Sequence, residues 1–144
     1  MACDGRGRPL AVVLTPGQRH DSTRLEPVLD AIRVPRPGNR GRPRQRPDQL
    51  IADKGCSYPK CRDQLRQRGI PHTIPERQDQ RERRARRPGR PLQFDQERYR
   101  RRTVVERCIN RLKQWRGLAT RFEKRAANYR AMVVIAALMI WLPA

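Results

Sequence analysis

Two arginine- and proline-rich segments divide this sequence and limit which parts of it can build a core. Residues 34–47 contain four prolines and five arginines without an acidic residue, and residues 76–91 contain seven arginines against three acidic residues. Such segments bury too little apolar surface to offset the entropy lost on ordering. We therefore expect both to form basic loops, and any core must come from the short apolar runs around them.

The apolar runs predict short strands that alternate with helices. We expect strands over 9–14, 50–52 and 70–74, and helices over 25–32, 59–68, 93–116 and 128–142. Asp95 is the expected N-cap of the third helix and Gly117 its stop signal. The last helix contains a 12-residue apolar run, Ala131–Leu142, which is too short to span a bilayer and predicts a buried helix.

The charge of the chain indicates a polyanionic partner. The sequence has 34 Lys and Arg against 14 Asp and Glu, a formal net charge of +20. Such a protein repels itself at neutral pH and is attracted to polyanions, of which nucleic acid is the most abundant. A solvated basic face without a function is the simpler explanation of the same charge. The four cysteines lack paired CxxC spacing, which favours reduced thiols over a zinc site.

Two acidic residues stand out in this basic chain. Asp53 ends an apolar strand, where open α/β sheets place their ligands. Glu106 lies on a helix whose other charges from Arg98 to Arg116 are all positive. At about 100° per residue, Glu106 shares a stripe about 60° wide with Tyr99, Arg102 and Lys113. Taken singly, Asp53 could simply begin a turn and Glu106 could be a solvated ion-pair partner.

Together the two acids predict a site for a hard divalent metal. Mg²⁺ prefers carboxylate oxygens, retains water molecules and bridges to phosphate. In two-metal phosphoryl transfer, the ions activate the attacking water and stabilise the leaving oxygen. Acidic residues within a basic surface therefore suit a nuclease, in which cations bind DNA and carboxylates bind metal.

The spacing of these residues resembles a known family. Tyr99-x₂-Arg102-x₃-Glu106-x₆-Lys113 resembles the Tyr-Arg-Glu-Lys signature of insertion-sequence transposases with an Asp-Asp-Glu (DDE) triad, closest to the insertion-sequence-five type. Ile51–Gly55 resembles the strand that carries the second acid of the triad, and the segments 104–107 and 116–124 resemble the region around the third. The loop 15–22 resembles the one after the family's third strand.

The resemblance implies a fold and an activity. The fold would be α/β, a ribonuclease-H-like mixed sheet with flanking helices. Asp53 and Glu106 would be the second and third catalytic acids and would bind Mg²⁺ or Mn²⁺. The activity would be DNA binding with metal-dependent cleavage at the element ends and strand transfer into target DNA, in the bacterial cytoplasm at the nucleoid and with no membrane partner. The implied DNA-binding residues are Tyr99, Arg102, Lys113, Arg116, Arg121 and Lys124.

The chain departs from the family pattern at its start. The family's first catalytic Asp lies on a strand upstream of the hairpin with which this chain begins, and neither Asp4, in a turn, nor Asp21, before a helix cap, is a suitable replacement. We therefore expect residues 1–144 to be the C-terminal part of a catalytic domain that lacks its first strand. Such a chain would be inactive alone, or would work as an oligomer or with an upstream segment in trans.

Two other interpretations stay open. One is a non-catalytic, arginine-rich nucleic-acid-binding protein. The other is a relic that barely folds.

Overall fold

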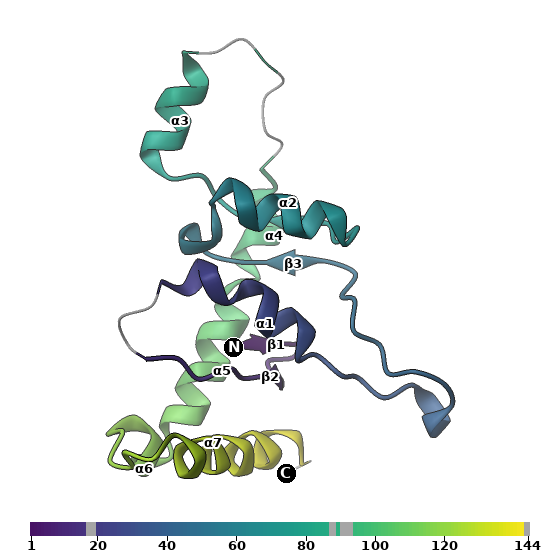
Figure 1. Cartoon of the computed structure of the whole chain (residues 1–144), viewed down its shortest axis with the longest axis vertical. Coiled ribbons are helices and arrows are strands. Elements are labelled where there is room, and N and C mark those ends of the chain that lie inside the picture. Colours follow the sequence, from purple (N-terminus) through teal and green to yellow (C-terminus); the bar gives the residue numbers. More distant parts are fainter. Residues whose placement is uncertain (17–19, 87–88, 90–93, 143–144) are drawn as a thin grey trace. The chain divides into compact units, whose positions relative to one another are not determined.

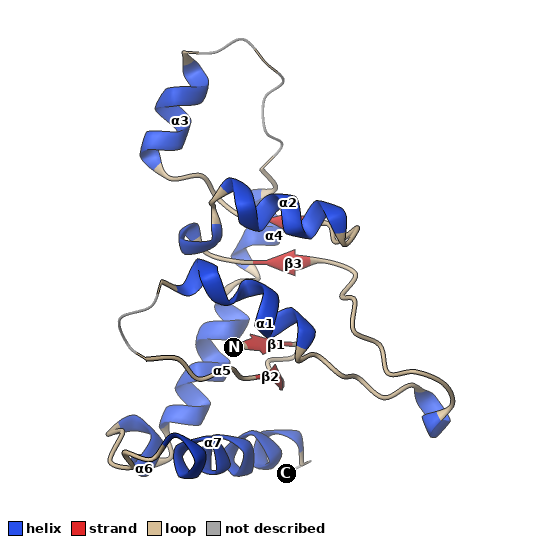
Figure 2. Ribbon diagram, in the orientation of Figure 1, coloured by secondary structure: helices blue, strands red, loops and turns tan. Residues whose placement is uncertain are grey.

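The computed structural model describes residues 1–16, 20–86, 89 and 94–142. Two compact units are present. Unit 1 comprises Met1–Arg19, Pro27–Gln45 and Thr103–Ala144, and unit 2 comprises His20–Glu26 and Arg46–Arg102. Helices account for most of the regular structure and the strands are short (Figure 2). The chain is thus of mixed α/β character, as expected.

Unit 1 combines a small antiparallel sheet with helices. Its strands are β1 (Ala2–Cys3) and β2 (Pro9–Ala11), and its helices are α1 (Leu25–Asp30, whose first two residues belong to unit 2), the 3₁₀ helix Pro37–Asn39, α5 (Thr103–Lys113), α6 (Arg116–Ala119) and α7 (Ala126–Trp141). Helix α5 contacts β1, α6 and α7, and α7 also contacts β2 (Figure 1). The core of the unit lies among these elements and is formed by Cys108, Leu112, Leu118, Val133, Ala136 and Ile140.

Unit 2 is built around a parallel strand pair. Its elements are the 3₁₀ helix Asp21–Arg24, β3 (Leu50–Ile51), the 3₁₀ helix Lys54–Cys56, α2 (Pro59–Gln67), β4 (His72–Thr73), α3 (Gln78–Ala85) and α4 (Gln96–Arg100). Leu50 pairs with His72 and Ile51 with Thr73. Helix α2 connects the two strands and buries Cys61 and Leu65, the latter completely. This βαβ arrangement confirms the strands expected over 50–52 and 70–74 and the helix over 59–68.

The described residues form two separate two-stranded sheets instead of one mixed sheet. The strands have two or three residues each, so they offer few backbone groups for further pairing. The hairpin also has its first strand, since β1 pairs with β2. With only three residues ahead of its turn, this hairpin is expected to lack its first strand, and the pairing of β1 with β2 shows that expectation to be wrong. The family's first strand, expected upstream of the hairpin, is a different strand. The turn between them is held by Asp4, whose Oδ1 accepts hydrogen bonds from the backbone N–H of Arg6 and of Arg8, both at 2.9 Å.

The second basic segment contains a helix where a loop was expected. Helix α3 occupies Gln78–Ala85, within the range 76–91. Its residues are Gln, Arg, Glu, Asp and Ala, most of which are strong helix formers, and a Gln78–Glu82 side-chain hydrogen bond of 3.0 Å joins successive turns. The high charge of the segment predicts a loop, but the intrinsic propensity of these residues favours a helix. The described part of the first basic segment is mostly loop, with one antiparallel bridge between Val34 and Arg44.

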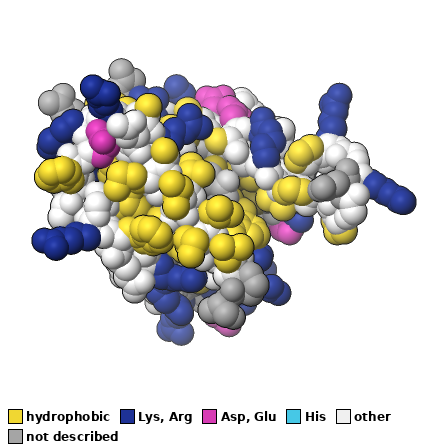
Figure 3. Space-filling model, turned by 90° about the horizontal axis from the view of Figure 1, so that it is seen from below, with side chains coloured by type: hydrophobic (Ala, Val, Ile, Leu, Met, Phe, Trp, Pro, Cys, Tyr) yellow, Lys and Arg dark blue, Asp and Glu magenta, His cyan; other side chains and the backbone are white. Residues whose placement is uncertain are grey.

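Helix α7 is buried on one face only, which corrects the prediction of a buried helix. Val133, Ala136 and Ile140 face the core, whereas Val134, Ile135, Leu138 and Met139 are each more than half exposed. Figure 3 shows this side of the molecule as a broad hydrophobic area with Lys and Arg side chains around it. A run of apolar residues does not reveal which of its faces a single layer of neighbours will cover. None of the helices in the described ranges is long and apolar enough to cross a membrane.

The end of α7 is attached to the hairpin by polar contacts. The Trp141 indole Nε1–H donates a hydrogen bond of 2.7 Å to the backbone oxygen of Pro9. The Arg8 guanidinium lies 4.2 Å from the centroid of the Trp141 ring, at cation–π distance. The hydrogen bond joins residues 132 positions apart in sequence, and the two contacts together hold α7 against β2.

Cys3, Cys61 and Cys108 are expected to react slowly with thiol reagents because their thiol pKa values are raised. All four cysteines are free thiols, as predicted. Burial raises the pKa of Cys3 to about 12 and raises the pKa of Cys61 and Cys108. For Cys3 this lowers the thiolate fraction at pH 8 by about a thousandfold, because each pKa unit is a factor of ten. We expect these three residues to be alkylated by iodoacetamide much more slowly than half-buried Cys56, as followed by peptide mass spectrometry.

Guanidinium-unfolded protein serves as the control, in which all four cysteines should react at similar rates. Equal rates in the folded protein would contradict the packing of Cys3 against Cys108.

Candidate functional site

Asp53 lies at the carboxyl end of β3, as the sequence predicted. Its backbone is extended and its carboxylate caps the 3₁₀ helix Lys54–Cys56, with Oδ1 accepting a 2.9 Å hydrogen bond from the backbone N–H of Gly55. The side chain is exposed. Within the described part of the chain, the second carboxylate oxygen has no partner. The cap therefore orients the carboxylate and leaves one hard oxygen donor open to solvent.

Gly55 makes room for this carboxylate. A Cβ atom placed on Gly55 would lie 3.0 Å from Oδ1 of Asp53, tighter than nine in ten real Cβ contacts. A side chain at position 55 would therefore require the carboxylate to shift by a few tenths of an ångström. The Asp53-x-Gly55 spacing therefore has a steric reason independent of any family motif.

The long helix expected over 93–116 is divided into α4 and α5. Asp95 caps α4 as predicted, accepting a 2.9 Å hydrogen bond from the backbone N–H of Arg98, whereas Gln93 lies outside the described residues. The α-helical bonding ends at Arg101 and Arg102, whose N–H groups bond to the carbonyls of Arg98 and Tyr99, three residues earlier. A continuous helix would place Arg98 and Arg102 one turn apart, a like-charge pair that costs about 0.2–0.5 kcal/mol.

This break divides the polar stripe inferred from the sequence. Tyr99 and Arg102 belong to unit 2, and Glu106 and Lys113 to unit 1. A stripe over all four side chains requires one uninterrupted helix. The spacing of about 100° per residue therefore relates only side chains that lie within α4 or within α5. Gly117 does not stop the helix either, because α5 ends at Lys113 and Gly117 lies inside α6.

Tyr99 and Arg102 contact each other in unit 2. The Arg102 guanidinium lies 5.4 Å from the Tyr99 ring centroid, and the ring packs at 5.3 Å against Phe94. Both side chains are half-buried. The aromatic contacts therefore restrict the direction in which Arg102 can present its charge.

Glu106 and the remaining basic residues belong to unit 1. Glu106 is exposed in the first turn of α5, where the helix dipole favours an acidic residue, and Lys113 is exposed in its last turn. Three further cations predicted to bind DNA, Arg116, Arg121 and Lys124, are all exposed on α6 and the loop after it.

The loop between α6 and α7 is well fixed. Arg121 adopts a positive φ of 49°, which is uncommon for a residue with a side chain. Glu123 accepts hydrogen bonds from the backbone N–H of Arg125 at 2.7 Å and from Asn128 Nδ2 at 3.2 Å. These hydrogen bonds hold the pKa of the Glu123 carboxyl below its usual value. The loop thus presents Arg121 and Lys124 next to a carboxylate that is already hydrogen-bonded to Arg125 and Asn128 at the start of α7.

Asp53 belongs to unit 2 and Glu106 to unit 1. Among the residues whose placement is described, no three His, Cys, Asp or Glu side chains converge as metal ligands do. The donor chemistry nevertheless fits a hard cation, because both side chains end in exposed carboxylate oxygens. Asp4 is unlike them. Its Oδ2 forms a 2.6 Å ion pair with Arg8, and its Oδ1 is used by the hairpin turn.

Sequence reasoning missed a second set of polar residues in unit 2. Glu76 follows β4 as Asp53 follows β3, and it forms a 2.6 Å ion pair with Arg84 of α3. Arg62 of α2 donates a 2.8 Å hydrogen bond to the carbonyl of Ile74. The cluster depends on α3, which the Gln, Arg and Glu content of residues 78–85 favours but which the expected loop over 76–91 does not include.

Comparison with known proteins identifies relatives over nearly the whole chain. The family model described as the transposase DDE domain matches residues 1–142. A Burkholderia cepacia protein, assigned by name as a transposase for insertion sequence element IS402, is 37% identical over 137 residues. The alignment covers 95% of this chain and 58% of the relative, so the chain spans little more than half of that protein's length. No solved structure matches the chain.

Proposed function

The chain belongs to the transposase DDE domain family, and on that premise we propose that it binds DNA and supplies two carboxylates, Asp53 and Glu106, to a metal-dependent site for DNA strand cleavage and transfer. The observation that carries the proposal is the Asp53 carboxylate, oriented by Gly55 at the end of β3 with one oxygen open. The insertion-sequence-five subtype and a ribonuclease-H-like fold of the complete domain belong to the same proposal.

The proposed function divides the residues into those that bind metal and those that bind DNA. Asp53 and Glu106 hold Mg²⁺ or Mn²⁺, which when bound supplies activation of water and stabilisation of the leaving oxygen. Lys113, Arg116, Arg121 and Lys124 neutralise DNA phosphates from unit 1, since all four are exposed cations. Tyr99 orients Arg102 toward a phosphate through the cation–π contact. The DNA comprises the element ends and the target.

The proposed metal site also needs a third carboxylate, in addition to those of Asp53 and Glu106. Asp4 is unsuitable because its oxygens are engaged by Arg6 and Arg8. Hydrogen bonds and the ion pair with Arg8 outweigh the effect of burial and hold the pKa of Asp4 below its usual value. We therefore propose that the chain is the C-terminal part of a catalytic domain and is inactive alone. It would complete its site as an oligomer or with another transposase segment in trans.

Mn²⁺ binding tests the carboxylate assignment. We expect paramagnetic relaxation of water by the wild-type protein with Mn²⁺, and a loss of at least about tenfold in Mn²⁺ affinity in Asp53→Asn and in Glu106→Gln, because carboxylate oxygens are the preferred ligands. Asp63→Asn and Glu97→Gln are the matched controls, since these two acids are also exposed on helices of the chain and have no role in the proposed site.

A protein that binds DNA but is indifferent to Mn²⁺ in all five forms would favour the non-catalytic, arginine-rich binder. Nicking of supercoiled DNA by the wild-type chain alone, abolished by Asp53→Ala, would show that the proposed inactivity is wrong.

A further inference from the structure

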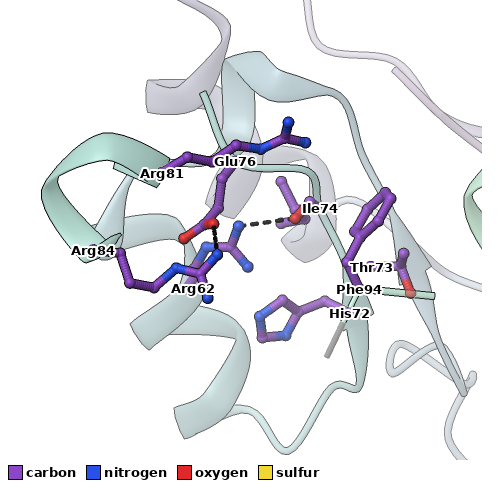
Figure 4. Close-up of a pocket in the computed structure, with 8 residues that line it drawn as sticks. All are labelled: Arg62, His72, Thr73, Ile74, Glu76, Arg81, Arg84 and Phe94. Atoms are coloured by element: carbon purple, nitrogen blue, oxygen red, sulfur yellow. Dashed lines mark hydrogen bonds and ion pairs between the residues drawn. The ribbon is translucent and has the colours of Figure 1, made fainter. Parts of the chain in front are cut away.

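Unit 2 contains a cavity beside β4 that none of the assignments above uses. It has a volume of about 290 Å³, near the lower end of the range for small-ligand pockets. Its lining comes from α2, from β4 and the residues after it, from α3 and from the segment before α4: Arg62, His72, Thr73, Ile74, Glu76, Arg81, Arg84 and Phe94. We call it the Arg62 cavity. Figure 4 shows Arg62, Arg84 and Glu76 converging in it, with the His72 ring nearby.

The charge of the Arg62 cavity is positive. Three arginines face one carboxylate, Glu76, which gives a formal excess of two positive charges without His72. Burial lowers the pKa of the Arg62 guanidinium, since removing water disfavours its charge, and the nearby Glu76 carboxylate only partly offsets this. Burial likewise lowers the pKa of His72, and the nearby Arg62 and Arg66 add to the effect. A bound anion would relieve all of these costs.

The hydrogen-bond donors of the cavity exceed its acceptors. Glu76 is paired with Arg84, and Arg62 uses one nitrogen on the carbonyl of Ile74. The Nε–H of Arg84 is buried and has no acceptor in the described part of the structure. Over the same residues, Arg81 makes no side-chain hydrogen bond or ion pair. A buried donor without a partner calls for an explanation, and an anion is an acceptor that would suit this positively charged cavity.

A phosphate group fits this set of donors. Guanidinium groups present forked donors that match phosphate oxygens, and two or three of them can share one phosphate. Phe94, 41% exposed and packed at 5.3 Å against Tyr99, adds an apolar surface to the lining. Tyr99 in turn contacts Arg102, so the cavity is linked to residues that the proposed function assigns to DNA.

We propose that the Arg62 cavity is a phosphate-binding pocket that holds a backbone phosphate of DNA, with Arg62, Arg81 and Arg84 as donors. The inference that the pocket binds a phosphate follows from the residues that line the cavity. The inference that this phosphate belongs to DNA rests on the proposed function. The pocket is a contact outside the metal-binding carboxylates, so it binds DNA whether or not the chain cleaves it.

The test compares three variants of one helix in the full 144-residue chain. Arg81→Gln and Arg84→Gln each remove a donor of the cavity, and Arg83→Gln is the matched control. Arg83 lies on α3 between them, is exposed and does not line the cavity. All three variants lose one positive charge. Arg81→Gln is decisive, because Arg84→Gln also removes the partner of Glu76 and could perturb folding.

Two measurements follow from the proposal. Inorganic phosphate, and separately a short DNA duplex, should each raise the pKa of His72 in NMR titrations, because a nearby anion favours the imidazolium. The only other histidine is His20, whose signals serve as an internal reference. Arg81→Gln should weaken duplex binding by about tenfold and reduce the salt slope by about one, whereas Arg83→Gln should leave the slope unchanged.

Each other outcome overturns a stated part of the proposal. An unchanged pKa of His72 with both ligands would rule out a phosphate pocket. A response to inorganic phosphate but not to the duplex would assign the pocket to a free phosphate compound instead of DNA. Equal losses in Arg81→Gln and Arg83→Gln would show that only diffuse charge matters. Failure of the Mn²⁺ test at Asp53 and Glu106 would leave all of these measurements unaffected.

Discussion

Raising the salt concentration from 50 to 200 mM is expected to weaken DNA binding by this chain about 10³–10⁵-fold, the effect of releasing counterions from about six to ten phosphates. The physical basis is the formal net charge of +20, of which residues 98–125 alone contribute eleven cations against two acidic residues. Fluorescence anisotropy with a labelled duplex over this salt range gives the slope of log K against log salt directly.

Sequence-shuffled duplexes are the control in this measurement. Phosphate contacts do not depend on the base sequence. Shuffled and native element-end duplexes should therefore show similar slopes of log K against log salt, even where their affinities differ. A slope near zero would contradict binding through the basic residues, and with it the roles proposed for Lys113, Arg116, Arg121 and Lys124.

Ala136→Asp is expected to lower the free energy of unfolding by about 3–5 kcal/mol, the cost of an uncompensated buried charge. Ala136 is fully buried in the core of unit 1, on the face of α7 that packs with Cys108 and Ile140. Urea unfolding followed by circular dichroism would measure the loss.

Leu138→Asp, two residues further along α7, is the matched control. Leu138 is 57% exposed, and most exposed substitutions change stability by less than about 0.5 kcal/mol. Equal destabilisation by the two substitutions would contradict the assignment of one buried and one exposed face to α7. Loss of cooperative unfolding already in the wild-type protein would instead favour the relic that barely folds.

Local sequence signals predicted the parts of the fold that depend on neighbouring residues. The cap at Asp95, the helix over 59–68 and the strands around Leu50 and His72 all follow from a few adjacent side chains. The turn at Asp53 belongs to the same group, because the cap and its glycine lie two residues apart. The caps and the helix are stabilised by short-range hydrogen bonds. The two strands are recognisable from their local apolar runs, although their hydrogen bonds join residues far apart, as in the pairing of Leu50 with His72.

The sequence alone thus determined the charge of the protein, the family motif and the local environment of Asp53. The tertiary structure decided which face of α7 is buried and that Glu76, Arg62 and Arg84 meet in one cavity. These features depend on contacts between residues far apart in the chain, such as Trp141 with Pro9. Neither the periodicity nor the composition of the sequence shows which distant residues will be in contact.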